Sequence, residues 1–167
     1  MTARDIQHCL IKSRYRQSFC VPNYTPKDWF ECDVMEITKA GYIREYEIKI
    51  SRADFLADRN KFKRTVAEDG IHCVDLNKHD LLAARSPRCP KQFYYVFPAG
   101  LMALDEVPEW AGVIVMQELD DRYGKRIHEG TLRQAPTLNN QPPKPEIRAH
   151  AETVFYWRFH NLFLKQK

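Results

Sequence analysis

The sequence predicts one α/β domain, a mixed four-stranded sheet flanked by helices, and three observations support this prediction. The chain has 167 residues, of which 44% are hydrophobic and 29% charged, a composition typical of a single globular domain. Two segments rich in β-branched and aromatic residues, 30–37 and 42–50, lie on either side of a short turn. Apolar residues recur at helical spacing near both ends of the chain.

The first helix is expected at about residues 3–15, where Ile6 and Leu10 lie one turn apart on the same side. A loop containing Pro22 and Pro26 then leads to the first strand. Asp5 near the helix start suits N-terminal capping, so we give it no role in a site.

After the hairpin and a second helix, we expect strands at 91–97 and 112–117. Residues 118–146 are polar and predict a loop or short hairpin, followed by a Pro-rich linker at 137–145. The last helix should span 146–165. Because it is apolar more than halfway round, we expect it to pack on the domain or to join a second copy in a homo-oligomer.

The turn between the two β-rich segments fixes which residues face each other. Lys39, Ala40 and Gly41 form a three-residue loop in which Gly41 takes a positive φ angle. Asp33 should then lie opposite Glu47, with Cβ atoms about 5 Å apart. The other expected pairs are Thr38 with Tyr42, Ile37 with Ile43 and Met35 with Glu45.

Alternation along the strands divides the hairpin into a charged and an apolar face. The charged face carries Glu31, Asp33, Glu45, Glu47 and Lys49, and the apolar face carries Phe30, Cys32, Val34, Tyr46, Ile48 and Ile50. A charged strand face is usually just solvated. Glu31 and Glu45 fit that interpretation and receive no role.

Asp33, Glu47 and Lys49 nevertheless form a candidate metal and phosphate site. Two facing carboxylates raise each other's pKa, and a hard cation such as Mg²⁺ removes this penalty. Lys49, on the same face, could stabilise charge on a phosphate or hold a water molecule.

A helix over about 51–69 is predicted next, with Ser51 as N-cap, Asp54 three residues later and Gly70 just past the end. Its expected core residues are Phe55, Phe62 and Val66, and a second stripe holds Asp54, Asp58 and Lys61.

A strand with Asp, a strand with Glu-x-Lys and then a helix resemble the core signature of the PD-(D/E)xK nuclease superfamily. The run EIKISRADFLADRNK is similar to the MmcB-type DNA-repair branch and to related small phage-borne proteins. QFYYVFPAGL, VPEWAGVIVM and LRQAP follow in a similar order, so the resemblance covers roughly residues 28–136. Cys32 stands where the signature often has Pro.

The resemblance implies a restriction-endonuclease-like core and assigns the site residues. Asp33, Glu47 and the backbone carbonyl of Ile48 would bind Mg²⁺ or Mn²⁺, and Lys49 would be the catalytic lysine. The implied activity is metal-dependent DNA endonuclease, in DNA repair, recombination or phage DNA processing. Two alternatives stay open: a catalytically inactive nucleic-acid-binding or assembly protein that retains the fold, and a plain structural module.

The formal charge of +4 is too small to predict DNA binding by itself, so the local distribution matters more. Basic residues gather on or beside the predicted second helix, where they would contact DNA phosphates: Arg52, Lys61, Lys63 and Arg64. A second basic group, Arg85, Arg88 and Lys91, lies in the loop before residue 92.

Several classes of protein do not fit the sequence. There is no apolar run long enough for a membrane span and no signal peptide, and five Cys without a CxxC pair predict free thiols in the cytoplasm. His72, Cys73, His79 and Cys89 match no standard zinc spacing, so we expect them to be scattered polar and core residues.

Overall fold

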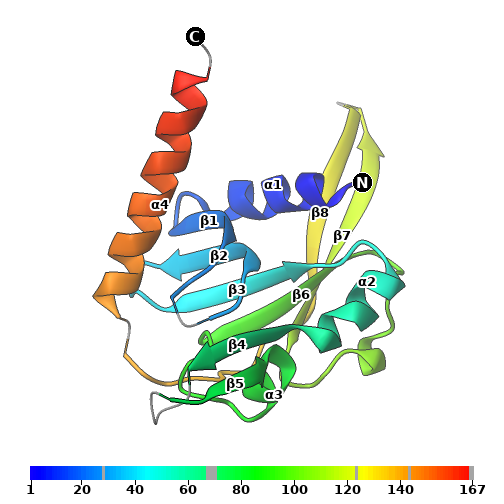
Figure 1. Cartoon of the computed structure of the whole chain (residues 1–167). Helices are drawn as coiled ribbons and strands as arrows, with labels where there is room; N and C mark the ends of the chain where they lie inside the picture. The colour runs from blue at the N-terminus through cyan, green and yellow to red at the C-terminus, as the bar shows by residue number, and fades with distance from the viewer. Residues whose placement is uncertain (28, 67–70, 123, 143, 166–167) are drawn as a thin grey trace.

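A computed structural model describes the chain except for residues 28, 67–70, 123, 143 and 166–167 (Figure 1). Its centre is a six-stranded mixed sheet in the order β1-β2-β3-β6-β7-β8, in which β6 runs parallel to β3 and β7, and the other neighbours are antiparallel. These strands are β1 (Ser18–Tyr24), β2 (Cys32–Thr38), β3 (Ile43–Ile48), β6 (Gln92–Pro98), β7 (Gly112–Asp121) and β8 (Gly124–Arg133). The α/β class and the mixed sheet are confirmed, whereas the count of four strands is wrong.

The two faces of the sheet carry different layers (Figure 1). Helix α1 (Ala3–Arg14) covers one face through Ile6 and Leu10, as its spacing predicted. The other face carries a two-stranded ribbon and short helices: α2 (Arg52–Ala57), the 3₁₀ turns η1 (Asp58–Asn60) and η2 (Leu104–Glu106), β4 (Phe62–Val66), β5 (Cys73–Asn77) and α3 (Lys78–Ala83). Strand β6 contributes side chains to the core on both faces of the sheet. Tyr94 and Val96 pack towards α1. Phe93, Tyr95 and Phe97 pack towards α2 and α3.

The β2–β3 hairpin has the predicted register. Gly41 has a φ angle of 83°, and its N–H donates to the carbonyl of Thr38 at 2.8 Å. The pairs Ile37–Ile43 and Met35–Glu45 are as expected, and the ladder ends at Val34–Tyr46, directly next to Asp33 and Glu47. On the predicted apolar face, Val34, Tyr46 and Ile48 pack against α1, but Phe30 belongs to the core on the other face and Ile50 is 47% exposed.

The predicted helix over 51–69 is wrong beyond its first turns. Ser51 is the N-cap, with Oγ accepting from the backbone N–H of Asp54 at 3.1 Å, but α2 ends at Ala57. Phe62 and Val66 lie in β4 and are 60% and 59% exposed instead of facing the core. Their spacing of four residues fits a helix and a strand equally well, and the β-prone run FKRTV pairs with β5. Gly70, the expected end, lies outside the described residues.

A strand replaces the loop predicted around Pro22, and the stretch from 118 takes the hairpin alternative of its prediction. The loop expected around Pro22 is β1, an edge strand that tolerates Pro because it pairs only with β2. The polar stretch from 118 is the hairpin of β7 and β8, whose far end stands clear of the sheet (Figure 1). Gly124, with a φ angle of 101°, lies at its turn.

Helix α4 (Pro145–Leu164) packs its first half against β1 and β2 through Ile147, Ala151 and Val154, and its second half projects past the sheet (Figure 1). The large apolar side chains that are exposed there are Phe155, Tyr156, Trp157, Phe159, Leu162 and Leu164. The Pro-rich segment before α4 packs as well, since Leu138 is 4% exposed. Among the described residues, no helix is both long and apolar enough to cross a membrane. The homo-oligomer stays a prediction.

Candidate functional site

The charged face of the hairpin is buried beneath α2, α3 and the β4–β5 ribbon. Glu47 is 2% exposed and Lys49 is 5% exposed, so this face is not the solvated surface that alternation commonly produces. Asp33 is half-buried, and its Oδ2 accepts from the backbone N–H of Ile48 at 2.7 Å. The charges of Glu47 and Lys49 both act on the Asp33 carboxyl, so the three predicted residues come together.

Three lysines surround the carboxylate of Glu47. Lys61 Nζ lies 2.7 Å and Lys49 Nζ 3.1 Å from Glu47 Oε1. Lys78 Nζ lies 2.8 Å from Glu47 Oε2. Lys49 and Lys78 are buried, whereas the Lys61 side chain is 31% exposed. Both oxygens of Glu47 therefore already interact with cations, of which Lys61 is the one with room to move.

Lys78 joins Glu47 to a second buried acid, Glu45. Lys78 is fully buried at the start of α3, and its Nζ lies 2.6 Å from Glu45 Oε1. Glu45 Oε2 accepts from Trp29 Nε1 at 2.6 Å. Glu45 was given no role from the sequence, but it shares the one cation that holds Glu47 Oε2.

Lys49 is fixed from its other side by Asp58, which lies in η1. Lys49 Nζ is 2.9 Å from Asp58 Oδ1. Asp58 Oδ2 accepts from the hydroxyl of Tyr95 at 2.8 Å and lies 3.0 Å from His79 Nε2. Tyr95 and His79 therefore hold Asp58, and Asp58 in turn holds the ammonium group of Lys49.

These interactions set the charge states of the site. Burial alone would lower the pKa of Lys49, but Glu47 and Asp58 outweigh it and raise that pKa. Burial would likewise raise the pKa of Glu47, but Lys78, Lys61 and Lys49 outweigh it and lower that pKa. Burial, reinforced by the charge of Glu47, raises the pKa of Asp33 from 3.8 to about 6. Burial also raises the pKa of Glu45. Lys49 is thus a cation, and Asp33 and Glu45 are the two carboxyls of the site whose pKa is raised.

The cluster, defined as Asp33, Glu45, Glu47, Asp58, Lys49, Lys61 and Lys78, sets four carboxyl groups against three ammonium groups. This imbalance and the raised pKa of Asp33 suit a divalent cation between Asp33 and Glu47. Mg²⁺ commonly takes only one or two carboxylates besides substrate phosphate, so the two acids are enough. Binding would require Lys61 to leave Glu47 Oε1. Among the described residues, no group of three or more His, Cys, Asp or Glu side chains forms a ready metal cage.

Ile48 reaches the site only through its backbone. Its side chain is 5% exposed and packs in the core beneath α1, on the opposite face of the sheet from Glu47. Its N–H donates to Asp33 and fixes the position of that carboxyl group.

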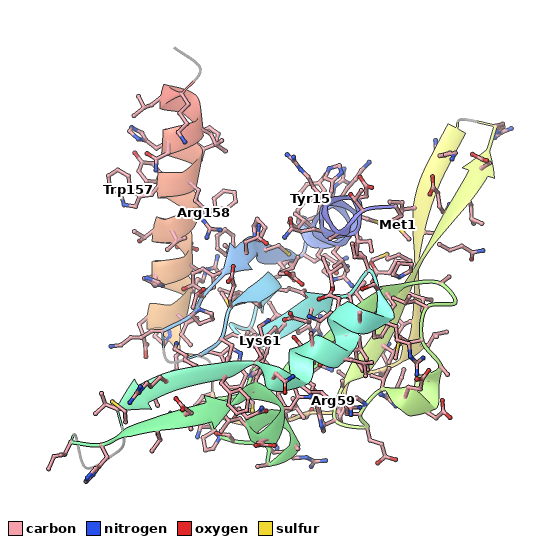
Figure 2. The ribbon with its side chains drawn as sticks, turned by 45° about the vertical axis from the view of Figure 1, so that its right-hand side comes forward. Met1, Tyr15, Arg59, Lys61, Trp157 and Arg158 are labelled. Carbon is pink, nitrogen blue, oxygen red and sulfur yellow. The ribbon has the colours of Figure 1, made fainter. Side chains whose placement is uncertain are left out.

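The predicted DNA-binding residues do not form one helix stripe. Arg52 lies on α2 and is ion-paired with Glu106, and Lys61 follows η1 (Figure 2). Lys63 and Arg64 are successive residues of β4, so they point to opposite faces of the ribbon. Lys63 Nζ donates to the carbonyl of Trp29 at 2.6 Å, whereas Arg64 is exposed. Of these four residues only Arg52 lies on the helix, because α2 ends at Ala57, and DNA binding by the four stays a prediction.

Sequence reasoning missed the acids and cations that complete the cluster. Lys78 and Tyr95 are 31 and 48 residues beyond Glu47, and no local spacing connects them. The charged face of the hairpin was the one signal in the sequence for these residues. Glu45 shares this face with Glu47, and buried carboxylates need cationic or hydrogen-bonding partners. Cys73 is exposed and Cys89 is buried.

The chain has a similar fold to one solved protein. That structure is the SPO1766 protein of unknown function from Silicibacter pomeroyi. It matches with a TM-score of 0.57 and 19% identity, over 96% of this chain and 85% of that chain. No protein-family model and no curated protein matches the sequence. The similarity supports the fold over nearly the whole chain, including the layer that buries the cluster.

Proposed function

We propose that this protein is a Mg²⁺- or Mn²⁺-dependent DNA endonuclease of the PD-(D/E)xK type, acting in DNA repair, recombination or phage DNA processing. One observation carries the proposal: Asp33 and Glu47 directly follow the Val34–Tyr46 pair of the hairpin, and Lys49 stays protonated 3.1 Å from Glu47. Burial and the charge of Glu47 raise the pKa of Asp33 to about 6. Two neighbouring carboxylates can bind a divalent cation, and a fixed lysine beside them can stabilise charge on a phosphate. Metal-dependent phosphodiester hydrolysis uses this combination.

The surrounding fold agrees with the resemblance seen in the sequence. Strands β1, β2, β3 and β6 form a mixed four-stranded set within the six-stranded sheet, and helices lie on both sides of it. The Asp strand, the Glu-x-Lys strand and the short helix α2 follow one another directly. This arrangement supports a restriction-endonuclease-like core.

The residues would divide the chemistry as follows. Asp33 and Glu47 would hold the cation, which supplies a more acidic bound water and a polarised phosphate. Lys49, kept protonated by Glu47 and Asp58, would donate hydrogen bonds to a phosphate oxygen as negative charge develops there. A protonated lysine does not accept a proton, so Lys49 acts as an electrostatic stabiliser and not as a general base. Lys61 would leave Glu47 and contact an adjacent phosphate.

A nuclease assay with Mg²⁺ and with Mn²⁺ on single-stranded, duplex and branched DNA tests the proposal. Lys49→Ala should lower cleavage by at least about 100-fold, with little loss of DNA binding, as expected for one electrostatic donor at the reacting group. Lys12→Ala, which removes an exposed charge on α1, is the matched control and should cleave like wild type. Asp33→Asn removes a proposed metal ligand but leaves the buried lysines in place, so it should also lower cleavage. Wild type that binds DNA but cuts none of the substrates contradicts the endonuclease.

The second candidate is a nucleic-acid-binding or assembly protein that retains the fold without catalysis. The observation that favours it is the contact of both Glu47 oxygens with lysine ammonium groups, since a lysine-satisfied carboxylate needs no metal. This candidate predicts DNA binding that is equal in EDTA and in Mg²⁺ and is unchanged by Asp33→Asn.

A further inference from the structure

A cavity of about 390 Å³ lies beside the cluster on the same face of the sheet. The turn between β2 and β3, the end of β4 and the segment before α4 meet there, below the base of α4 at the left of Figure 1. Its volume is within the range of about 300–1,000 Å³ that is usual for small-molecule sites. The cavity shares only Glu45 with the cluster, and the candidate catalytic residues Asp33, Glu47 and Lys49 do not line it.

The inner wall of the cavity is mainly apolar. Trp29, Cys32, Met35 and Cys89 line it and are each at most 5% exposed. Among the described residues, Glu45 is the one carboxylate that lines the cavity, and it is already ion-paired with Lys78 at 2.6 Å. The described part of the wall therefore offers mainly apolar contact.

The rim of the cavity is cationic. Lys27, Arg88, Lys91 and Lys144 come from three separate segments and line the same opening. Within the part of the chain that the structure describes, none of these four is within ion-pair distance of a carboxylate. Lys91 Nζ instead lies 3.4 Å from the centre of the Tyr42 ring, which holds it at the rim. Uncompensated cations around an apolar wall suit a ligand with an apolar body and a phosphate.

Strand β3 places this cavity one nucleotide step from the candidate catalytic residues. Glu45 lines the cavity, and Glu47 lies two residues further on the same face, about 7 Å away at the usual rise of a strand. Lys78 contacts both carboxylates, so the cavity wall and the cluster share one cation. This proximity selects a nucleotide among phosphate-bearing ligands.

We propose that the cavity is a subsite for one unpaired nucleotide of a DNA strand, with its base against the apolar wall and its phosphate on the cationic rim. The choice of a nucleotide and its place next to the cleaved bond rest on the proposed endonuclease function, whereas binding of a ligand with an apolar body and a phosphate does not. Reading an unpaired base in a pocket requires a single strand or a nucleotide turned out of the duplex. The substrate class is thus DNA with unpaired nucleotides.

Titration of the full chain in EDTA, followed by calorimetry and by amide NMR shifts, tests the subsite without metal or cleavage. The probes are dTMP, thymidine, inorganic phosphate and the single strand dT₄. We expect dTMP to bind at least tenfold more tightly than thymidine or phosphate alone, dT₄ to bind more tightly than dTMP, and the shifts to centre on residues 41–45 and 88–91. Equal affinity for dTMP and phosphate, or shifts centred elsewhere, would overturn the proposal. Binding of dTMP with exclusion of dT₄ would overturn the strand assignment in favour of a free mononucleotide.

The double variant Arg88→Ala/Lys91→Met removes two rim charges and should weaken dTMP binding about tenfold or more, as two lost charge-assisted contacts imply. Lys12→Met, on the opposite face, is the control and should bind dTMP like wild type. A double variant that folds and binds dTMP normally would refute the subsite. Failure of the two proposals is distinguishable: wild type that binds dTMP through these residues but cuts no DNA contradicts only the endonuclease. Wild type that cuts DNA with a KM unchanged in the double variant contradicts only the subsite.

Discussion

Two buried carboxylates on neighbouring strands, Glu36 and Glu47, have opposite kinds of surroundings. Each is 2% exposed, Glu36 towards α1 and Glu47 towards α2 and α3. Glu36 accepts hydrogen bonds from the hydroxyls of Ser18 and Tyr46. Arg44 lies 3.4 Å from it. These groups come mainly from adjacent strands, and together they stabilise the single negative charge of Glu36. Glu36 therefore helps to hold the strands together.

Glu47 lies instead in a group where the charges do not balance. Its cluster has four carboxyl groups against three ammonium groups, and burial, reinforced by the charge of Glu47, raises the pKa of Asp33. The comparison teaches that burial of an acid does not mark a functional site. Two features distinguish the Glu47 side. The neighbouring carboxyl of Asp33 has a raised pKa, and the cation Lys61 is partly exposed and has room to move away from Glu47.

The largest effect should come from removing the buried cation of the Glu47 side. Lys78→Met leaves Glu45 and Glu47 buried with one cation fewer and should cost about 3–5 kcal/mol of unfolding free energy, as broken buried ion pairs do. Tyr46→Phe on the Glu36 side removes one hydrogen-bond donor and should cost about 1–2 kcal/mol. Urea denaturation measures both. Equal losses would mean that the two acids are held in the same way.

The second prediction uses the pKa of Asp33. A carboxyl whose pKa is higher in the folded protein stabilises the fold when protonated, and this contribution is lost as pH rises through the folded value, here from about 4 to about 6. Asp33→Asn removes the penalty, so it should stabilise the protein by about 3 kcal/mol at pH 7.5 and by much less at pH 4. Unfolding free energies at the two pH values measure the difference. Glu36→Gln, the matched change on the other face, should show no such gain. Stabilisation by Asp33→Asn that is equal at both pH values would contradict the raised pKa.

The sequence predicted this hairpin because its determinants are local. Gly41, the alternation on either side of it and Ser51 as a cap are signals within a few residues, and the register followed from them. The layer over Glu47 depends on contacts across the chain, such as Lys78 with Glu45, which spacing does not report. FKRTV shows the same limit: apolar residues four apart satisfy both helical and strand periodicity, and pairing with β5 decides between them.

The third prediction tests metal binding. Mn²⁺ or Mg²⁺ bound only by the folded protein stabilises it by about 1.4 kcal/mol at ten times Kd, which should raise Tm by a few degrees. Asp33→Asn should abolish this increment. Lys61→Ala should enlarge it, because the cation no longer competes with an ammonium group at Glu47 Oε1. Thermal unfolding with and without 5–10 times Kd of metal measures the shift. An equal increment in wild type and Asp33→Asn would place the ion elsewhere.

The smallest expected effect concerns docking of DNA on the Glu47 side of the sheet. Arg64 is exposed on β4, so a phosphate that it contacts should contribute the same affinity for every sequence. Arg64→Ala should weaken binding a fewfold and make the plot of log affinity against log salt shallower by about one unit of slope. Arg44→Ala on the Glu36 side, where the Arg44 side chain is 41% exposed, should leave the slope unchanged. Fluorescence anisotropy at four or more salt concentrations measures both slopes. If Arg44→Ala lowers the slope and Arg64→Ala does not, DNA docks on the α1 face, and the cluster around Glu47 is then too far from the phosphates to cut them.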